Sequence, residues 1–296
     1  NVALRVGDKP SLDALINYAK KEKITDELRA EAIAALGTWA DPSVLDRVDG
    51  RYRGIFLRDV ASVKSTIEPH LSAFLNAENP ETQIAISQLL SNLKIDNFND
   101  KLVNIFENTK DPKVKIAAID ALSSLNYSGL DKIVQSGLQN EKSEVRVASI
   151  GALSKLNIDE NSLNEIVKPI IEKGLIREKQ RLINTLANMP ISKTEQVLGS
   201  MIDLMAAEKL DKELLLDLSE AVKKTNSETL LAKLNANKKS DDWFEEFKMA
   251  LFGGDFREGR NIFNNNSTAQ CVRCHTTNPG APSTVGPNLG KIGSKL

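Results

Sequence analysis

The stretch DPKVKIAAIDALSSLN, residues 111–126, returns 31 residues later as EKSEVRVASIGALSKLN, residues 141–157. The two copies share three apolar positions, which pair Val114 with Val145, Ile119 with Ile150 and Leu122 with Leu153. Apolar residues three or four positions apart line one face of an α-helix, so each copy predicts an amphipathic helix. A unit that recurs at a fixed interval of roughly 30 residues is typical of a helical solenoid.

Further copies flank this pair: NPETQIAISQLLSNL at 79–93, REKQRLINTLANM at 177–189 and LRAEAIAALGTWA at 28–40. Small residues in these segments allow close helix packing, as expected for Ala85, Ala118 and Ala148. Asn79-Pro80 and Asp111-Pro112 each indicate a helix start, because the first side chain caps free N–H groups and proline has none to leave unpaired.

The pattern predicts an all-α fold with two helices per repeat. Apolar residues recur at helical spacing from about residue 9 to residue 240, with further helices expected at 101–110, 130–140 and 163–174. We therefore expect a HEAT-like α-solenoid domain over residues 1–240. The interval is shorter than the HEAT length of about 40 residues, so tetratricopeptide and ankyrin repeats remain alternatives, although their Trp-Leu-Gly-Tyr and Thr-Pro-Leu-His patterns are absent.

The composition argues against two classes of partner. A formal net charge of -1 and a pI near 6.3 give no support for broad electrostatic binding to nucleic acid or to anionic membranes. No apolar run approaches the roughly 20 residues of a membrane-spanning helix, and residues 1–20 lack the features of a signal peptide. Because the chain begins with Asn1, we expect it to be a processed or excised part of a longer protein.

A second domain is predicted over residues 241–296. A polar joint at 238–242 ends the repeats, and WFEEFKMALF at 243–252 predicts one more amphipathic helix, ended by Gly253 and Gly254. A short helix is expected from Phe256 to Phe263. The segment after His275 is rich in Gly, Pro, Ser and Asn, which predicts loop.

Both cysteines of the chain lie in AQCVRCHTTNPG, residues 269–280, beside one of its two histidines. Cys271 and Cys274, three positions apart on one helical turn, can form thioethers with the two vinyl groups of a haem. His275 would then face the iron as its proximal axial ligand. Cys-x-x-Cys-His is the attachment motif of c-type haem, so the sequence predicts haem c and its iron as the cofactor.

Other interpretations of this motif remain open. A structural zinc usually takes four Cys or His ligands, and the chain offers only one further candidate, His70, which follows Pro69 where a capping or surface histidine is expected. A thioredoxin-like redox pair expects a βαβ setting, whereas this setting is helix and loop. A disulfide at this spacing would be strained within a helix.

The flanking motifs EGRNIF at 258–263 and GPNL at 286–289 resemble those of the class I cytochrome c fold, as does the interval of 12 residues from His275 to Pro287. The resemblance implies that residues 241–296 form the N-terminal portion of such a domain. It further implies that the carbonyl group of Pro287, in the Gly286-Pro287 pair, accepts a hydrogen bond from His275. Phe263 and Leu289 would pack against the haem.

The pattern of this family is incomplete here. Class I cytochromes supply a methionine as the second axial ligand beyond the Gly-Pro-x-Leu motif, and no methionine follows Met249. Met189, Met201 and Met205 are expected to fill gaps in the helical core. We expect the second axial ligand to lie outside the chain, and an open iron position that binds small ligands is the alternative.

A wider resemblance covers nearly the whole chain. WADPSVLDRVDGRYRGI at 39–55, the repeats, FGGDFREGRNIF at 252–263 and CVRCH at 271–275 resemble the C-terminal part of a bacterial family of exported haem-binding proteins. In that family, a β-propeller similar to glucose/sorbosone dehydrogenases precedes HEAT-like repeats and a cytochrome c domain.

This resemblance implies a function for the chain. The chain would be an exported, periplasmic electron-transfer segment, not catalytic by itself, that exchanges electrons with an attached dehydrogenase domain or another redox partner. The alternative is an interaction scaffold in which the cysteine segment holds zinc or is oxidised.

Overall fold

The computed structural model describes residues 2–21, 23–46, 50–236, 249–254, 256–266, 268–278, 280–282 and 285–294. As predicted, the fold is all-α. The described residues contain no strand, and only the isolated bridge between Leu45 and Tyr52 pairs extended backbone. None of the described helices is long and apolar enough to span a membrane. The chain divides into two compact units, Asn1–Met189 and Pro190–Leu296.

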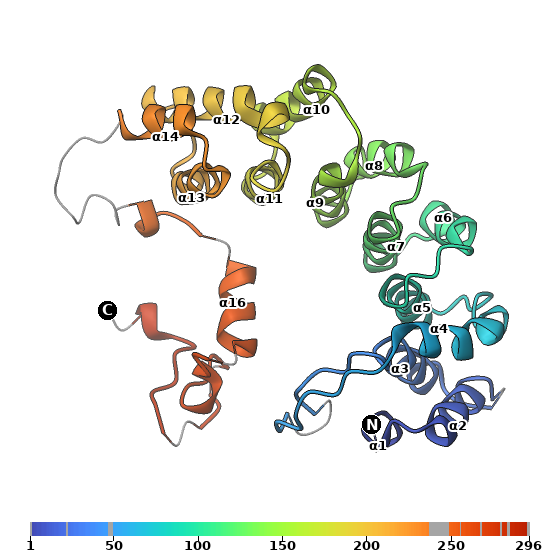
Figure 1. Cartoon of the computed structure of the whole chain (residues 1–296). Helices are drawn as coiled ribbons and strands as arrows, with labels where there is room; N and C mark the ends of the chain where they lie inside the picture. Colours follow the sequence, from blue (N-terminus) through green and yellow to red (C-terminus); the bar gives the residue numbers. More distant parts are fainter. Residues whose placement is uncertain are drawn as a thin grey trace. The chain divides into compact units, whose positions relative to one another are not determined.

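The repeated segments form alternate helices of the first unit. Its helices are α1 (Val2–Val6), α2 (Lys9–Ala19), α3 (Asp26–Gly37), α4 (Val60–Ile67), α5 (Pro80–Asn92), α6 (Asn99–Asn108), α7 (Pro112–Ser124), α8 (Leu130–Leu138), α9 (Ser143–Ala152), α10 (Glu160–Lys173) and α11 (Ile176–Leu186), with 3-10 turns η1 (Glu68–Ala73) and η2 (Leu153–Lys155). The helices α3, α5, α7, α9 and α11 each pack against the next in this order (Figure 1).

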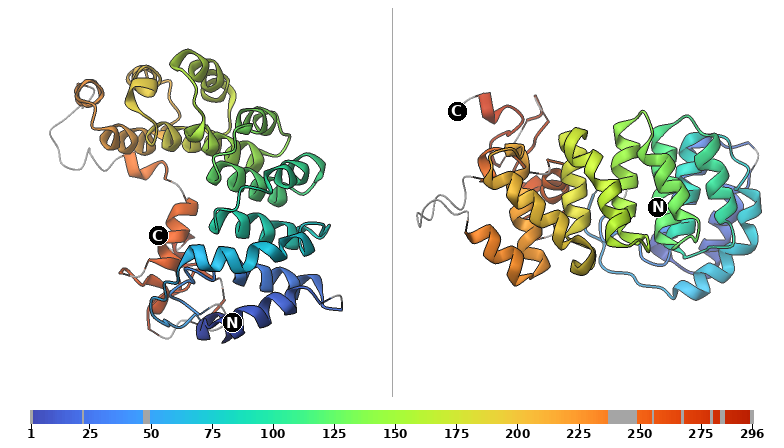
Figure 2. Two further views of the ribbon diagram at one scale, coloured as in Figure 1. Left: turned by 45° about the vertical axis from the view of Figure 1, so that its right-hand side comes forward. Right: turned by 90° about the horizontal axis from the view of Figure 1, so that it is seen from above.

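Each helix between them is the second helix of a repeat. The helix α6 packs on α7, α8 on α9 and α10 on α11, so each repeat contains two helices, as predicted (Figure 2). The boundaries agree with the sequence analysis to within about three residues, which is the usual uncertainty of helix ends. The assignment of this stack to a HEAT-like solenoid remains a prediction.

The predicted core positions are buried. The six paired apolar residues of the repeat are each at most 1% exposed: Val114, Val145, Ile119, Ile150, Leu122 and Leu153. Ala85 and Ala118 are buried as well, whereas Ala148 is half-buried. In that repeat the position equivalent to Ala118 is Ser149, which is fully buried and donates its hydroxyl hydrogen bond to the carbonyl oxygen of Val145, 2.9 Å away.

Capping residues set the predicted helix starts. The side chain of Asn79 accepts a hydrogen bond from the backbone N–H of Thr82 at 3.1 Å. Asp111 accepts one from Lys113 N at 2.7 Å and a longer one from Val114 N at 3.4 Å. These bonds satisfy N–H groups that the first helical turn leaves without a partner.

Polar contacts also join consecutive repeats. Lys64 Nζ donates to the carbonyl oxygen of Lys94 at 2.9 Å, and Lys94 Nζ in turn donates to Ser124 Oγ at 2.7 Å. Further along, Arg146 on α9 forms a 2.7 Å ion pair with the buried carboxylate of Glu178 on α11. Each contact spans 30 to 32 residues, so it links a repeat to its immediate neighbour.

The segment between α3 and α4 departs from the helical structure expected over residues 9–240. Its described residues have no helix, and the guanidinium group of Arg58 anchors the segment by donating to the carbonyl oxygens of Trp39 and Leu4. The backbone N–H of Asp46 donates to Arg51 O at 2.8 Å.

The second unit begins with three helices that pack on one another, α12 (Ile191–Ala206), α13 (Leu215–Thr225) and α14 (Glu228–Asn235), with a 3-10 turn η3 (Lys212–Leu214). Met201 is buried here, as is Met189 at the end of the first unit, which agrees with the predicted core role of both. The predicted boundary at 240/241 and most of the predicted helix at 243–252 lie outside the described residues.

Replacement of Gly37 by alanine is expected to destabilise the first unit. An added Cβ would lie 2.8 Å from the Cα of Leu89, so α3 and α5 would have to move apart. Overpacking of this kind costs about 1–3 kcal/mol. The control is Gly151→Ala, whose Cβ would meet only the flexible end of Arg181 and should leave stability unchanged or slightly raised. If urea unfolds both variants at the same midpoint concentration, the close approach of α3 to α5 at Gly37 is contradicted.

Loss of the cap at Asp111 is expected to weaken α7. Asp111→Ala should lower the free energy of unfolding by about 1 kcal/mol, and Asp111→Asn should leave it nearly unchanged because asparagine caps equally well. Urea unfolding measures both variants, and amide hydrogen exchange at Lys113 and Val114 localises the effect. A loss of similar size in the asparagine variant would show that the capping bond is not its cause.

Candidate functional site

The Cys-x-x-Cys-His motif begins on the 3-10 helix η5 (Cys271–Arg273), and Cys274 and His275 follow it directly. The carbonyl oxygen of Cys271 accepts hydrogen bonds from Cys274 N at 3.2 Å and from His275 N at 2.9 Å, which hold the five residues in one turn. Cys271 is half-buried and Cys274 is exposed, and no disulfide joins them. Both sulfur atoms therefore belong to one short, hydrogen-bonded turn that also carries His275.

A hydrogen bond orients the imidazole ring of His275. Its Nδ1 atom lies 2.9 Å from the carbonyl oxygen of Pro287. Because a carbonyl group only accepts, Nδ1 carries the proton and donates it, which leaves the lone pair of the neutral ring on Nε2. Nε2 is thus the nitrogen available to a metal. This is the hydrogen bond that the cytochrome resemblance implies, and its effect on a haem iron remains a prediction.

Gly286 allows the Pro287 loop to lie against this ring. Its backbone N–H donates to the carbonyl oxygen of Cys274 at 2.8 Å. A Cβ atom at this position would lie 2.7 Å from the same oxygen and from Cε1 of His275. Because no side chain fits in this space, steric hindrance explains why the GPNL motif has glycine at this position.

The sequence analysis missed Asn288, which holds the loop together. Its side-chain nitrogen donates to the carbonyl oxygens of Asn278 and Ala281, each at 2.9 Å. Its side-chain oxygen accepts from Gly290 N at 2.8 Å. Asparagine side chains often form hydrogen bonds to backbone groups in turns. The position of Asn288 in a Gly- and Pro-rich segment could therefore have indicated this structural role.

The remaining predicted residues flank this loop. Leu289 is half-buried, and its N–H donates to the carbonyl oxygen of Thr276 at 2.8 Å. Phe263 is half-buried on α16 (Phe256–Asn265), which begins where the short helix was predicted and packs against η5. The loop prediction for the end of the chain is confirmed in its described residues, apart from the short turn η6 (Ile292–Ser294).

The segment around the motif has few buried side chains. Among the described side chains of residues 249–294, none is fully buried. Seven of its large apolar side chains are between 40% and 74% exposed: Leu251, Phe252, Phe256, Ile262, Val272, Val285 and Ile292. Soluble domains usually bury such residues, and a cluster of exposed ones indicates a surface that an apolar group covers.

These features fit a covalently attached haem. The turn offers two sulfur atoms, His275 offers Nε2, and the segment offers apolar side chains to a large apolar ring system. Among the described residues, no three His, Cys, Asp or Glu side chains lie together in a group that could hold a metal ion.

His70 has a local structural partner. Lys20 Nζ lies 2.8 Å from His70 Nδ1. The 3-10 turn η1 follows α4 directly and begins at Glu68, with Pro69 in its first positions. His70 therefore lies within this turn and is half-buried.

Comparison of the chain with protein-family models and with curated proteins gives no match. The family resemblance therefore rests on the motifs themselves, and the class of protein remains a proposal.

The two histidines are expected to hold opposite tautomers. The Lys20 ammonium group only donates, so Nδ1 of His70 must accept and its proton lies on Nε2, whereas His275 carries its proton on Nδ1. Long-range proton–nitrogen NMR of the haem-free chain at about pH 8, above the ordinary histidine pKa, distinguishes the two. A proton on Nε2 of His275 would contradict the bond to Pro287.

Gly286→Ala is expected to abolish the preference of His275 for the tautomer with its proton on Nδ1. The added methyl group would displace the ring of His275 from the carbonyl oxygen of Pro287. The matched control is Gly259→Ala on α16, where a Cβ has no atom within 4 Å. The control should retain the Nδ1–H signal of His275. Retention of the signal in Gly286→Ala as well would show that the close contact is not required.

Proposed function

We propose that the chain transfers electrons through a covalently bound c-type haem, as the haem-carrying segment of a larger exported, dehydrogenase-like oxidoreductase. The observation that carries this proposal is the single turn that presents both thiols and His275, together with the 2.9 Å hydrogen bond from His275 to Pro287. Few other functions require this combination of residues at this spacing.

Each residue of the site has a role in this proposal. Cys271 and Cys274 would hold the haem through thioether bonds, and Nε2 of His275 would bind its iron. Phe263 and Leu289 would contribute apolar surface. The haem, when bound, supplies the one-electron iron couple, and the protein sets its potential through ligation, burial and hydrogen bonding.

The chain's own contribution is to orient His275. The carbonyl group of Pro287 selects one tautomer and holds the ring, and it increases the basicity of Nε2, as hydrogen-bond partners of metal-bound histidines do. Gly286 makes this arrangement possible because it leaves room for the ring. Two backbone bonds, from Gly286 to Cys274 and from Leu289 to Thr276, connect the loop to the motif.

Location and partners follow from the resemblance. Haem is attached to this motif outside the bacterial cytoplasm, so we infer an exported, periplasmic protein. An attached dehydrogenase domain or a separate redox partner would supply the electron, and the second axial ligand would lie outside this chain.

The alternative function is an interaction scaffold with a zinc-bound or oxidised cysteine segment. The stacked helices of the first unit support it, because repeat stacks commonly present extended binding surfaces. Metal analysis separates the two proposals, since the scaffold predicts zinc or no metal where the cytochrome predicts iron.

Expression of the chain with an export signal and a haem-attachment system is expected to yield one covalent haem per chain. The visible spectrum should show a c-type band, and the peptide that contains residues 271–275 should retain the haem mass after denaturation. The double variant Cys271→Ala with Cys274→Ala should lose covalent haem completely. Arg273→Ala, which leaves the motif intact, is the control and should retain it. Absence of iron from the exported wild-type chain would overturn the proposal.

A further inference from the structure

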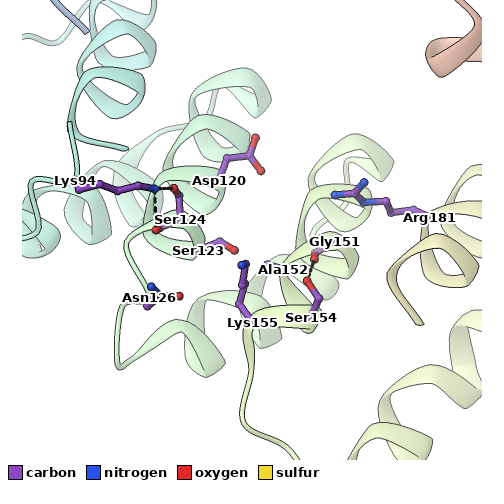
Figure 3. Close-up of a pocket in the computed structure, with 10 residues that line it drawn as sticks. All are labelled: Lys94, Asp120, Ser123, Ser124, Asn126, Gly151, Ala152, Ser154, Lys155 and Arg181. Atoms are coloured by element: carbon purple, nitrogen blue, oxygen red, sulfur yellow. Dashed lines mark hydrogen bonds between the residues drawn. The ribbon is translucent and has the colours of Figure 1, made fainter. Parts of the chain in front are cut away.

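A groove of about 540 Å³ opens on the first unit, where α7, α9 and α11 lie side by side. Figure 3 shows Asp120 on α7 and Arg181 on α11, whose side chains extend toward the space between these helices. Lys155, from the turn η2, points into the same space, and Ser123 and Asn126 line it from the end of α7. Residues of three consecutive repeats thus meet in one groove.

Four hydrogen-bonding side chains of this groove have no partner within the described part of the chain. They are the guanidinium group of Arg181, the ammonium group of Lys155, the hydroxyl group of Ser123 and the amide group of Asn126. Lys94 differs, because its ammonium group already donates to Ser124 Oγ at 2.7 Å. The groove therefore offers several hydrogen-bond donors, two of them cationic, that no other side chain uses.

The side chains of Lys155 and Arg181 are not needed as hydrogen-bond donors to the carbonyl groups at the end of α7. Three of the last carbonyl groups of α7 accept backbone hydrogen bonds from the residues that follow: Ala121 O from Leu125 N at 2.9 Å, Ser123 O from Asn126 N at 3.2 Å and Leu122 O from Tyr127 N at 3.0 Å. The last one, Ser124 O, accepts from Lys94 Nζ at 3.4 Å, so all four have partners without Lys155 or Arg181.

The charges of the groove favour an anion. Lys94, Lys155 and Arg181 contribute three positive charges, against the single carboxylate of Asp120. Asp120 is exposed and makes no ion pair within 4 Å with Arg181, although desolvation by the surrounding protein raises the pKa of its carboxyl group and the charge of Arg181 opposes this rise. Asp120 therefore offsets only part of the positive charge of the groove, and its carboxylate repels a bound anion.

We propose that this groove binds a small ligand through an oxyanion group, which is a carboxylate, phosphate or sulfate. Arg181 provides a planar pair of donors suited to such a group, and Lys155 adds a point charge. Ser123 and Asn126 add neutral donors. This inference is independent of the proposed haem, because every residue of the groove belongs to the first unit.

The experiment titrates the full chain with inorganic phosphate, sulfate and citrate at constant ionic strength and follows the backbone amide signals of Ser123, Asn126 and Gly151 by NMR. We expect saturable shifts. Saturation by phosphate or sulfate but not by citrate assigns a tetrahedral oxyanion, and saturation by citrate alone assigns a carboxylate ligand. The absence of a saturable shift with all three anions overturns the proposal.

Two variants with opposite expected effects test the assignment. Arg181→Met should weaken binding about tenfold, the factor that corresponds to one charge-assisted hydrogen bond. Asp120→Asn should tighten binding several-fold, since it removes the repelling charge, and misfolding could not produce this gain. Lys168→Met, an exposed lysine on α10, is the control and should bind like the wild type. Unchanged affinity in Arg181→Met overturns the proposal.

Discussion

The apolar side chains of each repeated helix are buried against the corresponding helix of the next repeat and against the second helix of its own repeat. The helices α3, α5, α7, α9 and α11 form this series, and the interval between repeats brings residues such as Ile119 and Ile150 into the same core. At Gly37 the absence of a side chain lets the α3 backbone lie against the backbone of Leu89. The groove and the lysine contacts between repeats exist because this packing holds neighbouring helices in a constant register.

The sequence predicted the repeat helices well because their signals are local. Capping residues and apolar spacing act within one or two turns, so Asp111 and Leu122 could be interpreted without tertiary structure. The irregular segment before α4 escaped prediction, because it is held by Arg58, whose acceptors at Leu4 and Trp39 lie far away in the sequence. The position equivalent to Ala118 was also misjudged, since the 31-residue offset places Ser149 there, not Ala148.

The candidate site likewise has features that could be predicted from the sequence and features that could not. The motif itself and the pairing of His275 with Pro287 could be predicted, because each depends on a short spacing in the sequence. The role of Asn288 depends on how the loop turns, and the exposed apolar side chains around the motif depend on tertiary packing. Those side chains add support to the haem proposal that the motif alone lacks, since the described part of this segment exposes apolar surface and buries none of its side chains.

The two lysine contacts have a consequence for how such a chain changes over evolution. Lys64 Nζ and Lys94 Nζ each donate to a residue 30 positions further on, the first to a backbone carbonyl oxygen and the second to a hydroxyl group. A junction that is nearly the same at successive repeats can be joined again after a whole unit is duplicated or lost, because the surfaces that meet already match. Length is therefore the property of this stack that can vary most easily.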